Sequence, residues 1–89
     1  MSNKPDFTQD KLTYGERYGY AMTIENVGTA QAYLLQLTQW HMRVTGRNET
    51  EAREIELQNI GYYAGYYDAE TRTRVYRLFN TTHPVLGDV

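Results

Sequence analysis

Four tyrosines fall within six consecutive positions of this chain, and their type and spacing favour molecular recognition. They lie in the run from Gly61 to Tyr67, together with two glycines. A buried helix rarely needs so many hydroxyl-bearing rings, whereas a binding surface uses tyrosine because the ring gives a large rigid area with a polar tip. The sequence therefore predicts a protein-binding surface whose first candidate residues are Tyr62, Tyr63, Tyr66 and Tyr67.

Three arginines, Arg72, Arg74 and Arg77, follow the tyrosine run. The guanidinium group pairs with carboxylates and stacks on rings, so these residues extend the predicted binding surface. A helix, a turn at Asp68 and an arginine-bearing helix also loosely resemble a helix-turn-helix. The alternative function is therefore a small DNA-binding regulator that uses the three arginines. The net charge of −2 weighs against it, and we expect direct nucleic-acid binding to be absent or weak.

Glutamates dominate the segment before the tyrosines, at Glu49, Glu51, Glu54 and Glu56. On a helix, Glu51 and Glu54 are expected on the outer face, where they would form the rim of the binding surface and steer a basic partner toward it. An ordinary solvated helix surface explains the same pattern. The sequence leaves both interpretations open.

The residue types needed for catalysis are scarce. The chain has no cysteine, its single serine is Ser2, and its two histidines, His41 and His83, are far apart. His41 lies on the apolar side of a predicted helix, where we expect a hydrogen-bonded core residue and not a ligand. Neither histidine has the spacing of a zinc helix, and no glycine-rich phosphate loop occurs. We therefore expect no enzyme activity, no catalytic residue, no metal site and no cofactor.

The elements that position these residues are predicted to be helices, because both prolines lie near the ends and no strand pattern with hairpin turns occurs. The patterns predict four helices, over about Thr8 to Ile24, Thr29 to Thr45, Glu49 to Tyr67 and Ala69 to Phe79. The fold class is therefore all-α, a compact bundle of about four helices with an extended C-terminal tail. We expect a single helical domain over residues 1–89, with 1–7 and 86–89 flexible.

Capping residues support several of these boundaries. Asn48, with a glutamate three positions later, gives a capping-box-like start for the third helix, and Asp68 is a good N-cap for the last one. Gly46 stands where a glycine commonly ends a helix. The start of the second helix stays open between Asn26 and Thr29.

Apolar residues recur at helical spacing, most clearly between Ala30 and Val44. The expected core has as its main members Leu34, Leu37, Trp40, Ile55, Ile60, Val75 and Leu78. The third predicted helix carries apolar residues on two sides. Either it is the central helix of the bundle, or one of its sides is covered by another molecule, for which a second copy of the chain, in a homodimer, is one candidate.

The composition also bounds the compartment. No apolar run approaches the roughly 18 residues that a membrane helix needs, and the N-terminus lacks the layout of a signal peptide. The absence of cysteine fits a reducing compartment. We expect a cytoplasmic protein with no membrane association.

The stretch from Asn59 to Gly87 resembles the C-terminal part of small, largely uncharacterised proteins that bacteriophages and bacterial mobile elements carry. The resemblance rests on the tyrosine run, on Arg-Val-Tyr-Arg-Leu-Phe ending at Phe79 and on His-Pro-Val-Leu-Gly beginning at His83. Proteins of that kind commonly bind a host complex and block it. The resemblance therefore implies a stoichiometric inhibitor of a host defence complex, such as a CRISPR effector. Its partner would be a host protein or nucleoprotein complex in the bacterial cytosol.

Overall fold

The structure, a computed structural model, describes Phe7 and residues 11–80. Its elements are α1 (Tyr14–Gly19), a 3-10 helix η1 (Tyr20–Thr23), α2 (Val27–Thr45), α3 (Glu49–Ala64) and α4 (Ala69–Phe79). Within this part of the chain no strand occurs. The predicted all-α bundle of about four helices is confirmed.

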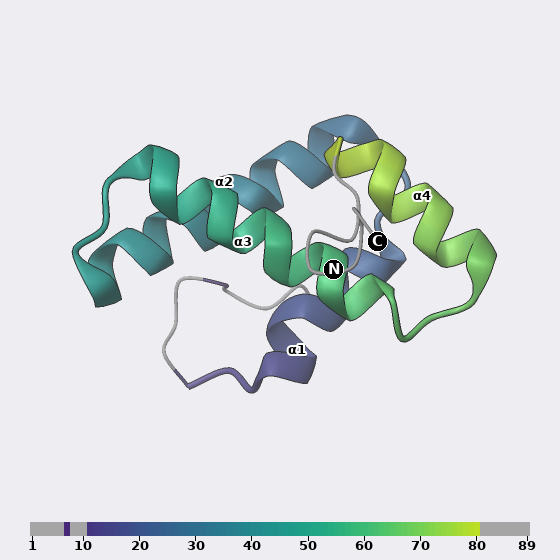
Figure 1. Cartoon of the computed structure of the whole chain (residues 1–89), viewed down its shortest axis with the longest axis horizontal. Helices are drawn as coiled ribbons and strands as arrows, with labels where there is room; N and C mark the ends of the chain where they lie inside the picture. Colours follow the sequence, from purple (N-terminus) through teal and green to yellow (C-terminus); the bar gives the residue numbers. More distant parts are fainter. Residues whose placement is uncertain (1–6, 8–10, 81–89) are drawn as a thin grey trace, which may run out of the picture.

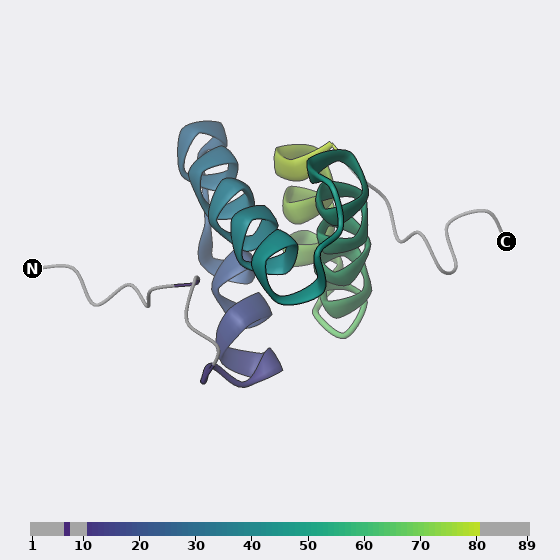
Figure 2. The same cartoon turned by 90° about the vertical axis from the view of Figure 1, so that its left-hand side faces the viewer.

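Helices α2 and α3 pack against each other and form the body of the bundle (Figure 1). Helix α4 folds back against α3 and also contacts α2 and η1 (Figure 2). The short helix α1, which comes before α2 in the chain, also packs against α3. This arrangement brings α1 next to the tyrosine run at the end of α3.

Each long helix begins at a side-chain cap. The side chains of Asn26, Asn48 and Asp68 each accept a hydrogen bond from the backbone N–H three residues later, at 2.8–2.9 Å. These bonds satisfy donors that the first turn of a helix leaves unpaired. Gly46 ends α2 with a φ of 79°, a left-handed conformation that glycine adopts without strain. The predicted caps are confirmed, and α2 begins after Asn26.

The first helix is shorter than predicted. It begins at Tyr14 and not near Thr8, because Thr13 caps it. The Thr13 hydroxyl accepts the Glu16 backbone N–H at 3.1 Å, and the Glu16 carboxylate accepts the Thr13 backbone N–H at 2.9 Å. This is a complete capping box, which fixes the start of the helix. The chain then tightens into η1 and does not continue as α-helix to Ile24.

Helix α3 ends at Ala64, before its predicted end, so Tyr66 and Tyr67 lie in the turn that leads to α4. The backbone N–H groups of the next three residues donate to carbonyls three positions back, at 3.0–3.1 Å. Such bonds tighten the last turn of a helix and end it. Asp68 then starts α4 in a new direction.

Buried side chains from all the helices form the core. Four of the predicted core residues are buried: Leu34, Leu37, Ile60 and Val75. Three are only half-buried, which corrects the prediction for them: Trp40, Ile55 and Leu78. Trp40 is half-buried, and the Arg17 guanidinium group lies over its ring.

Phe7 belongs to the core, and the other residues of the segment 1–7, for which we expect flexibility, lie outside the described residues. Its side chain is fully buried, with ring centroids 4.9 Å from Tyr20 and 4.8 Å from Tyr33. A buried aromatic side chain of this size contributes strongly to the core. The predicted C-terminal tail, including residues 86–89, lies outside the described residues.

Candidate functional site

Five tyrosines form a continuous aromatic group between α1 and the end of α3, here called the tyrosine surface: Tyr14, Tyr18, Tyr62, Tyr63 and Tyr66. The ring centroids of Tyr18 and Tyr63 lie 5.2 Å apart and join the two helices. Tyr14 meets Tyr18 at 6.0 Å, and Tyr62 meets Tyr66 at 5.4 Å. Tilted and edge-to-face contacts of this kind are favourable. The group is therefore held together by its own ring contacts.

The outer members of the tyrosine surface face solvent. Tyr14 is 66 % exposed, Tyr66 72 % and Tyr62 42 %. The hydroxyls of Tyr62 and Tyr66 share a hydrogen bond at 2.8 Å, and this bond raises the pKa of the Tyr66 phenol above its ordinary value. The two rings are thus paired although Tyr66 lies beyond the end of α3. Tyr62 and Tyr66, two of the candidate binding residues, are therefore an exposed pair.

The other two candidate tyrosines do not share a helical face, because α3 ends between them. Tyr63 is half-buried against Tyr18. Tyr67 is 43 % exposed, and its hydroxyl lies 4.0 Å from the position that a β-carbon on Gly19 would take. Tyr67 therefore lies beside the end of α1.

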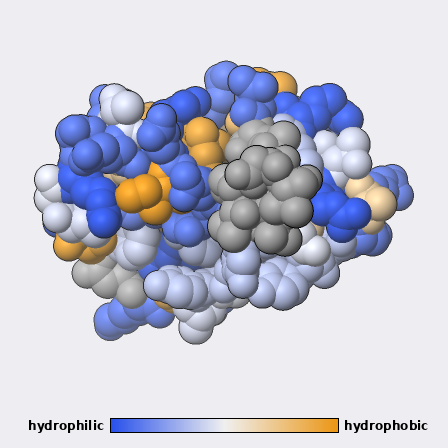
Figure 3. All heavy atoms as spheres, viewed as in Figure 1, coloured by the Kyte–Doolittle hydropathy of each residue, from blue (hydrophilic) through white to orange (hydrophobic). Residues whose placement is uncertain are grey.

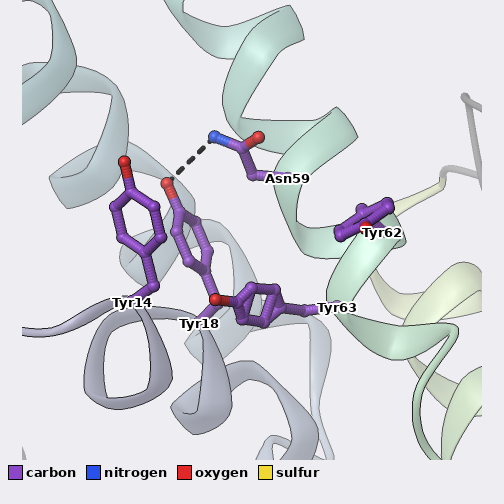
Figure 4. Close-up of a pocket in the computed structure, with 5 residues that line it drawn as sticks. All are labelled: Tyr14, Tyr18, Asn59, Tyr62 and Tyr63. Atoms are coloured by element: carbon purple, nitrogen blue, oxygen red, sulfur yellow. Dashed lines mark hydrogen bonds between the residues drawn. The ribbon is translucent and has the colours of Figure 1, made fainter.

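A pocket of about 230 Å³ opens within the tyrosine surface. It is lined by Tyr14, Tyr18, Asn59, Tyr62 and Tyr63. Figure 4 shows Tyr14 and Tyr18 side by side on α1, with Asn59 and Tyr63 reaching toward them from α3. The Asn59 amide donates to the Tyr18 hydroxyl at 3.0 Å. Aromatic walls with a few fixed polar groups are typical of binding pockets.

A buried polar network holds the inner wall of this pocket. The Tyr18 hydroxyl donates to one carboxylate oxygen of Glu56 at 2.6 Å, and His41 Nδ1 lies 2.5 Å from the other. His41 Nε2 lies 2.9 Å from a guanidinium nitrogen of Arg47. A guanidinium group only donates, so His41 Nε2 accepts and Nδ1 carries the proton that Glu56 accepts. The predicted role of His41 as a hydrogen-bonded core residue is confirmed.

The pKa values of two buried phenols follow from these surroundings. Burial, and then the negative charge of Glu56, raise the pKa of Tyr18 far above its ordinary value. Burial likewise raises the pKa of Tyr33, whose hydroxyl donates to the Arg17 carbonyl at 2.5 Å. Both hydroxyls therefore remain hydrogen-bond donors at neutral pH. The arrangement fixes the shape of the site and supplies no free base.

Arg17 is a second buried charge. Its guanidinium carbon lies 3.8 Å from the ring centroid of Trp40, and its N–H groups donate to the carbonyls of Phe7 and Leu12 at 3.0 and 3.3 Å. It therefore ties the segment before α1 to α2. Sequence reasoning missed this role because arginine is almost always an exposed residue.

The three candidate arginines of α4 have different surroundings. Arg74 is half-buried and donates to the carbonyl of Met22 at 2.5 Å. Arg72 donates to the carbonyl of Tyr67 at 2.9 Å, whereas Arg77 is exposed. Two of the three guanidinium groups thus hold α4 against η1 and the preceding turn.

The glutamates of α3 divide between its two sides. Glu51 and Glu54 are exposed, as predicted. Glu56 does not belong to the predicted acidic patch, because its side chain is fully buried. Residues two apart on a helix point in different directions, so Glu56 faces inward where Glu54 faces outward.

Sequence reasoning missed three residues of the site: Tyr14, Tyr18 and Asn59. The two tyrosines had a readable signal, since they stand four apart, with Tyr14 inside the Thr13–Glu16 capping box and Tyr18 just after it. Asn59 had none. It is an ordinary amide one helical turn before Tyr63, and its role depends on where α1 packs.

The surface over α1 differs from the rest of the visible face. In the space-filling view of Figure 3, pale residues of intermediate hydropathy gather along the lower edge, where Figure 1 places α1. Strongly hydrophobic residues appear in that view only as small separate patches. The described residues contain no group of three or more His, Cys, Asp or Glu side chains that could hold a metal ion. None of the described helices is long and apolar enough to cross a bilayer.

Comparisons with models of protein families, with curated proteins and with solved structures found no match for this chain. The site is therefore interpreted from its own residues and contacts.

Proposed function

We propose that this chain is a non-enzymatic protein-binding module whose contact surface is the tyrosine surface. The observation that supports this most is the exposure of Tyr14, Tyr62 and Tyr66 within one connected group of rings. A contiguous group of exposed rings marks an interaction site more strongly than single exposed apolar residues do. Tyrosine is one of the residue types that contribute most to the free energy of protein–protein binding.

The way the rings are held supports the same conclusion. Tyr18, which contacts both Tyr14 and Tyr63, is fixed by its hydrogen bond to the buried Glu56. Tyr62 and Tyr66 fix each other through their hydroxyls. A surface that is already ordered before binding loses less conformational entropy when a partner arrives, and so binds more tightly.

The target class we propose is a host defence complex, such as a CRISPR effector in the bacterial cytosol. This part rests on the resemblance of Asn59 to Gly87 to small proteins of phages and mobile elements. A chain of 89 residues that covers a functional surface of a larger assembly would act stoichiometrically. It would need no substrate, metal or cofactor.

The test is inhibition of target cleavage by a panel of purified CRISPR effector complexes. Inhibition should saturate near an equimolar ratio and be lost with Tyr66→Ala. The control is Leu35→Ala, which also truncates an exposed side chain but lies on α2, outside the tyrosine surface. Inhibition that requires a large excess, or that survives truncation of the exposed tyrosines, contradicts the proposal. So does duplex DNA binding that depends on Arg77.

A further inference from the structure

One side of α3 is exposed along most of its length. Glu51, Glu54, Gln58 and Tyr62 follow one another at intervals of three and four residues, so they share that side, and all four are exposed. Tyr66 continues the row through its 2.8 Å hydroxyl contact with Tyr62. At about 1.5 Å per residue, the row from Glu51 to Tyr62 is about 16 Å long. An extended chain of about five residues has the same length.

The described residues do not balance the charge of the acidic half of this row. Within the described residues, the structure gives no ion pair to Glu51 or Glu54. Arg53 lies between them in sequence but on the other side of α3, where it lines a hollow with Leu35 and Glu49. A neutral partner along the row would remove water from two carboxylates without pairing them, which is unfavourable. A basic partner would pair them.

The aromatic half of the row also favours a positively charged partner. The face of an aromatic ring attracts a guanidinium or ammonium group. The rings of Tyr62 and Tyr66 meet at 84°, so a side chain that reaches them meets rings in two orientations, together with hydroxyl oxygens that accept hydrogen bonds. The chain already contains such a contact, since the Arg17 guanidinium carbon lies 3.8 Å from the ring centroid of Trp40.

We propose that this row binds an extended segment of the partner protein that carries arginine or lysine. One cationic side chain lies against the rings of Tyr62 and Tyr66, and its neighbours pair with Glu54 and Glu51. The inference rests on the proposed protein-binding function and names the chemistry of the partner surface.

Fluorescence anisotropy with a short labelled peptide of alternating arginine and glycine tests this proposal. The matched probe replaces each arginine by citrulline, which keeps the shape and removes the charge. The arginine peptide should bind at least about tenfold more tightly than the citrulline peptide. Tyr66→Leu, which keeps apolar bulk but removes the ring, should weaken arginine binding several-fold. The double variant Glu51→Gln with Glu54→Gln should weaken it and lower its dependence on salt.

Leu35→Ala is the control for these variants and should leave peptide binding unchanged, and thermal melts should show that every variant is folded. Equal affinity for the arginine and citrulline peptides overturns the proposal. Arginine binding that responds to the glutamine changes but not to Tyr66→Leu also overturns it, because that is general charge attraction. The peptide assay contains no host complex, so the two proposals fail separately. Inhibition lost in Tyr66→Ala without any arginine preference refutes only the basic segment. Arginine preference without inhibition refutes only the host target.

Discussion

The inward and outward sides of α3 use polar side chains in opposite ways. On the inward side, Glu56 is fully buried and both of its oxygens have partners, in Tyr18 and His41. On the outward side, Glu54 is exposed without an ion pair among the described residues, and Tyr62 exposes 42 % of its surface. The inward groups are bonded within the fold, whereas the outward groups are exposed to solvent.

This difference predicts that substitutions on the two sides have separable consequences. Inward changes should lower the stability of the fold, because a buried polar group that loses its partner is strongly unfavourable. Outward changes should alter binding and leave stability nearly unchanged. The following predictions test this separation, from the largest expected effect on stability to the smallest.

Glu56→Ala should have the largest effect. It leaves the Tyr18 hydroxyl and the His41 N–H buried without their acceptor, and each unsatisfied buried donor costs about 1–3 kcal/mol, so the two together should cost about 2–6 kcal/mol. Urea denaturation measures the loss. The matched change on the outward side, Glu54→Ala, should shift the free energy of unfolding by no more than about 0.5 kcal/mol. Equal losses from the two substitutions would remove the distinction between the sides.

Leu37→Ala should follow. Leu37 is fully buried, and emptying a leucine site in a core usually costs about 2–5 kcal/mol. Its control is Leu35→Ala on the same helix, since Leu35 is 50 % exposed. A loss below about half a kcal/mol for Leu37→Ala would show that α2 faces the other way.

The helices and their caps could be predicted from the sequence because their signals are local. Asn48, Asp68 and Gly46 act within one turn of their own position, so the second helix ends, and the third and fourth helices begin, where predicted. The capping box at Thr13 was equally local and was overlooked. The end of α3 was misplaced because apolar and aromatic residues continue past Ala64, while the turn depends on where α4 must begin.

The candidate site was only half predictable. The exposed tyrosines on α3 could be named, because four rings in six positions cannot all point inward. Tyr14 and Tyr18 have a local signal, but the contacts of Tyr18 with Asn59 and Tyr63 join residues more than 40 positions apart, and no local pattern encodes such contacts. The burial of Glu56 could not be predicted for the same reason, since its partners lie on α1 and α2.

Tyr18→Phe should lower the free energy of unfolding by about 1–3 kcal/mol, less than Glu56→Ala or Leu37→Ala, because it removes one hydroxyl from the buried network. It should also change the response to alkaline pH. The pKa of Tyr18 is raised in the folded state, so its contribution to stability is complete below its ordinary value of 10.0 and falls as pH rises above that value. Denaturation curves through this range should show a shallower loss in Tyr18→Phe than in the wild type. An identical slope would place the Tyr18 hydroxyl in water.

Asp68→Asn should have the smallest effect, visible only in acid. The hydrogen bond from Thr71 lowers the pKa of the Asp68 carboxylate below its ordinary value of 3.8. Its contribution is therefore present above that value and is lost as pH falls through the lowered pKa of the folded state. Asparagine caps the helix without ionising, so melting temperatures measured at descending pH should fall less steeply in the variant. A wild-type slope in Asp68→Asn would assign the acid response to other carboxylates.

Alanine substitution at Tyr62, Tyr63, Tyr66 and Tyr67, with thermal melting and partner binding measured on the same samples, tests the central claim most directly. Substitution of the exposed Tyr66 should weaken binding by about 30-fold or more if Tyr66 is a hot spot, with almost no change in the melting temperature. Substitution of Tyr63, which packs against Tyr18, should lower the melting temperature as well. If every substitution lowers the melting temperature and none weakens binding by itself, the tyrosines belong to the core. The tyrosine surface would then not be a binding surface.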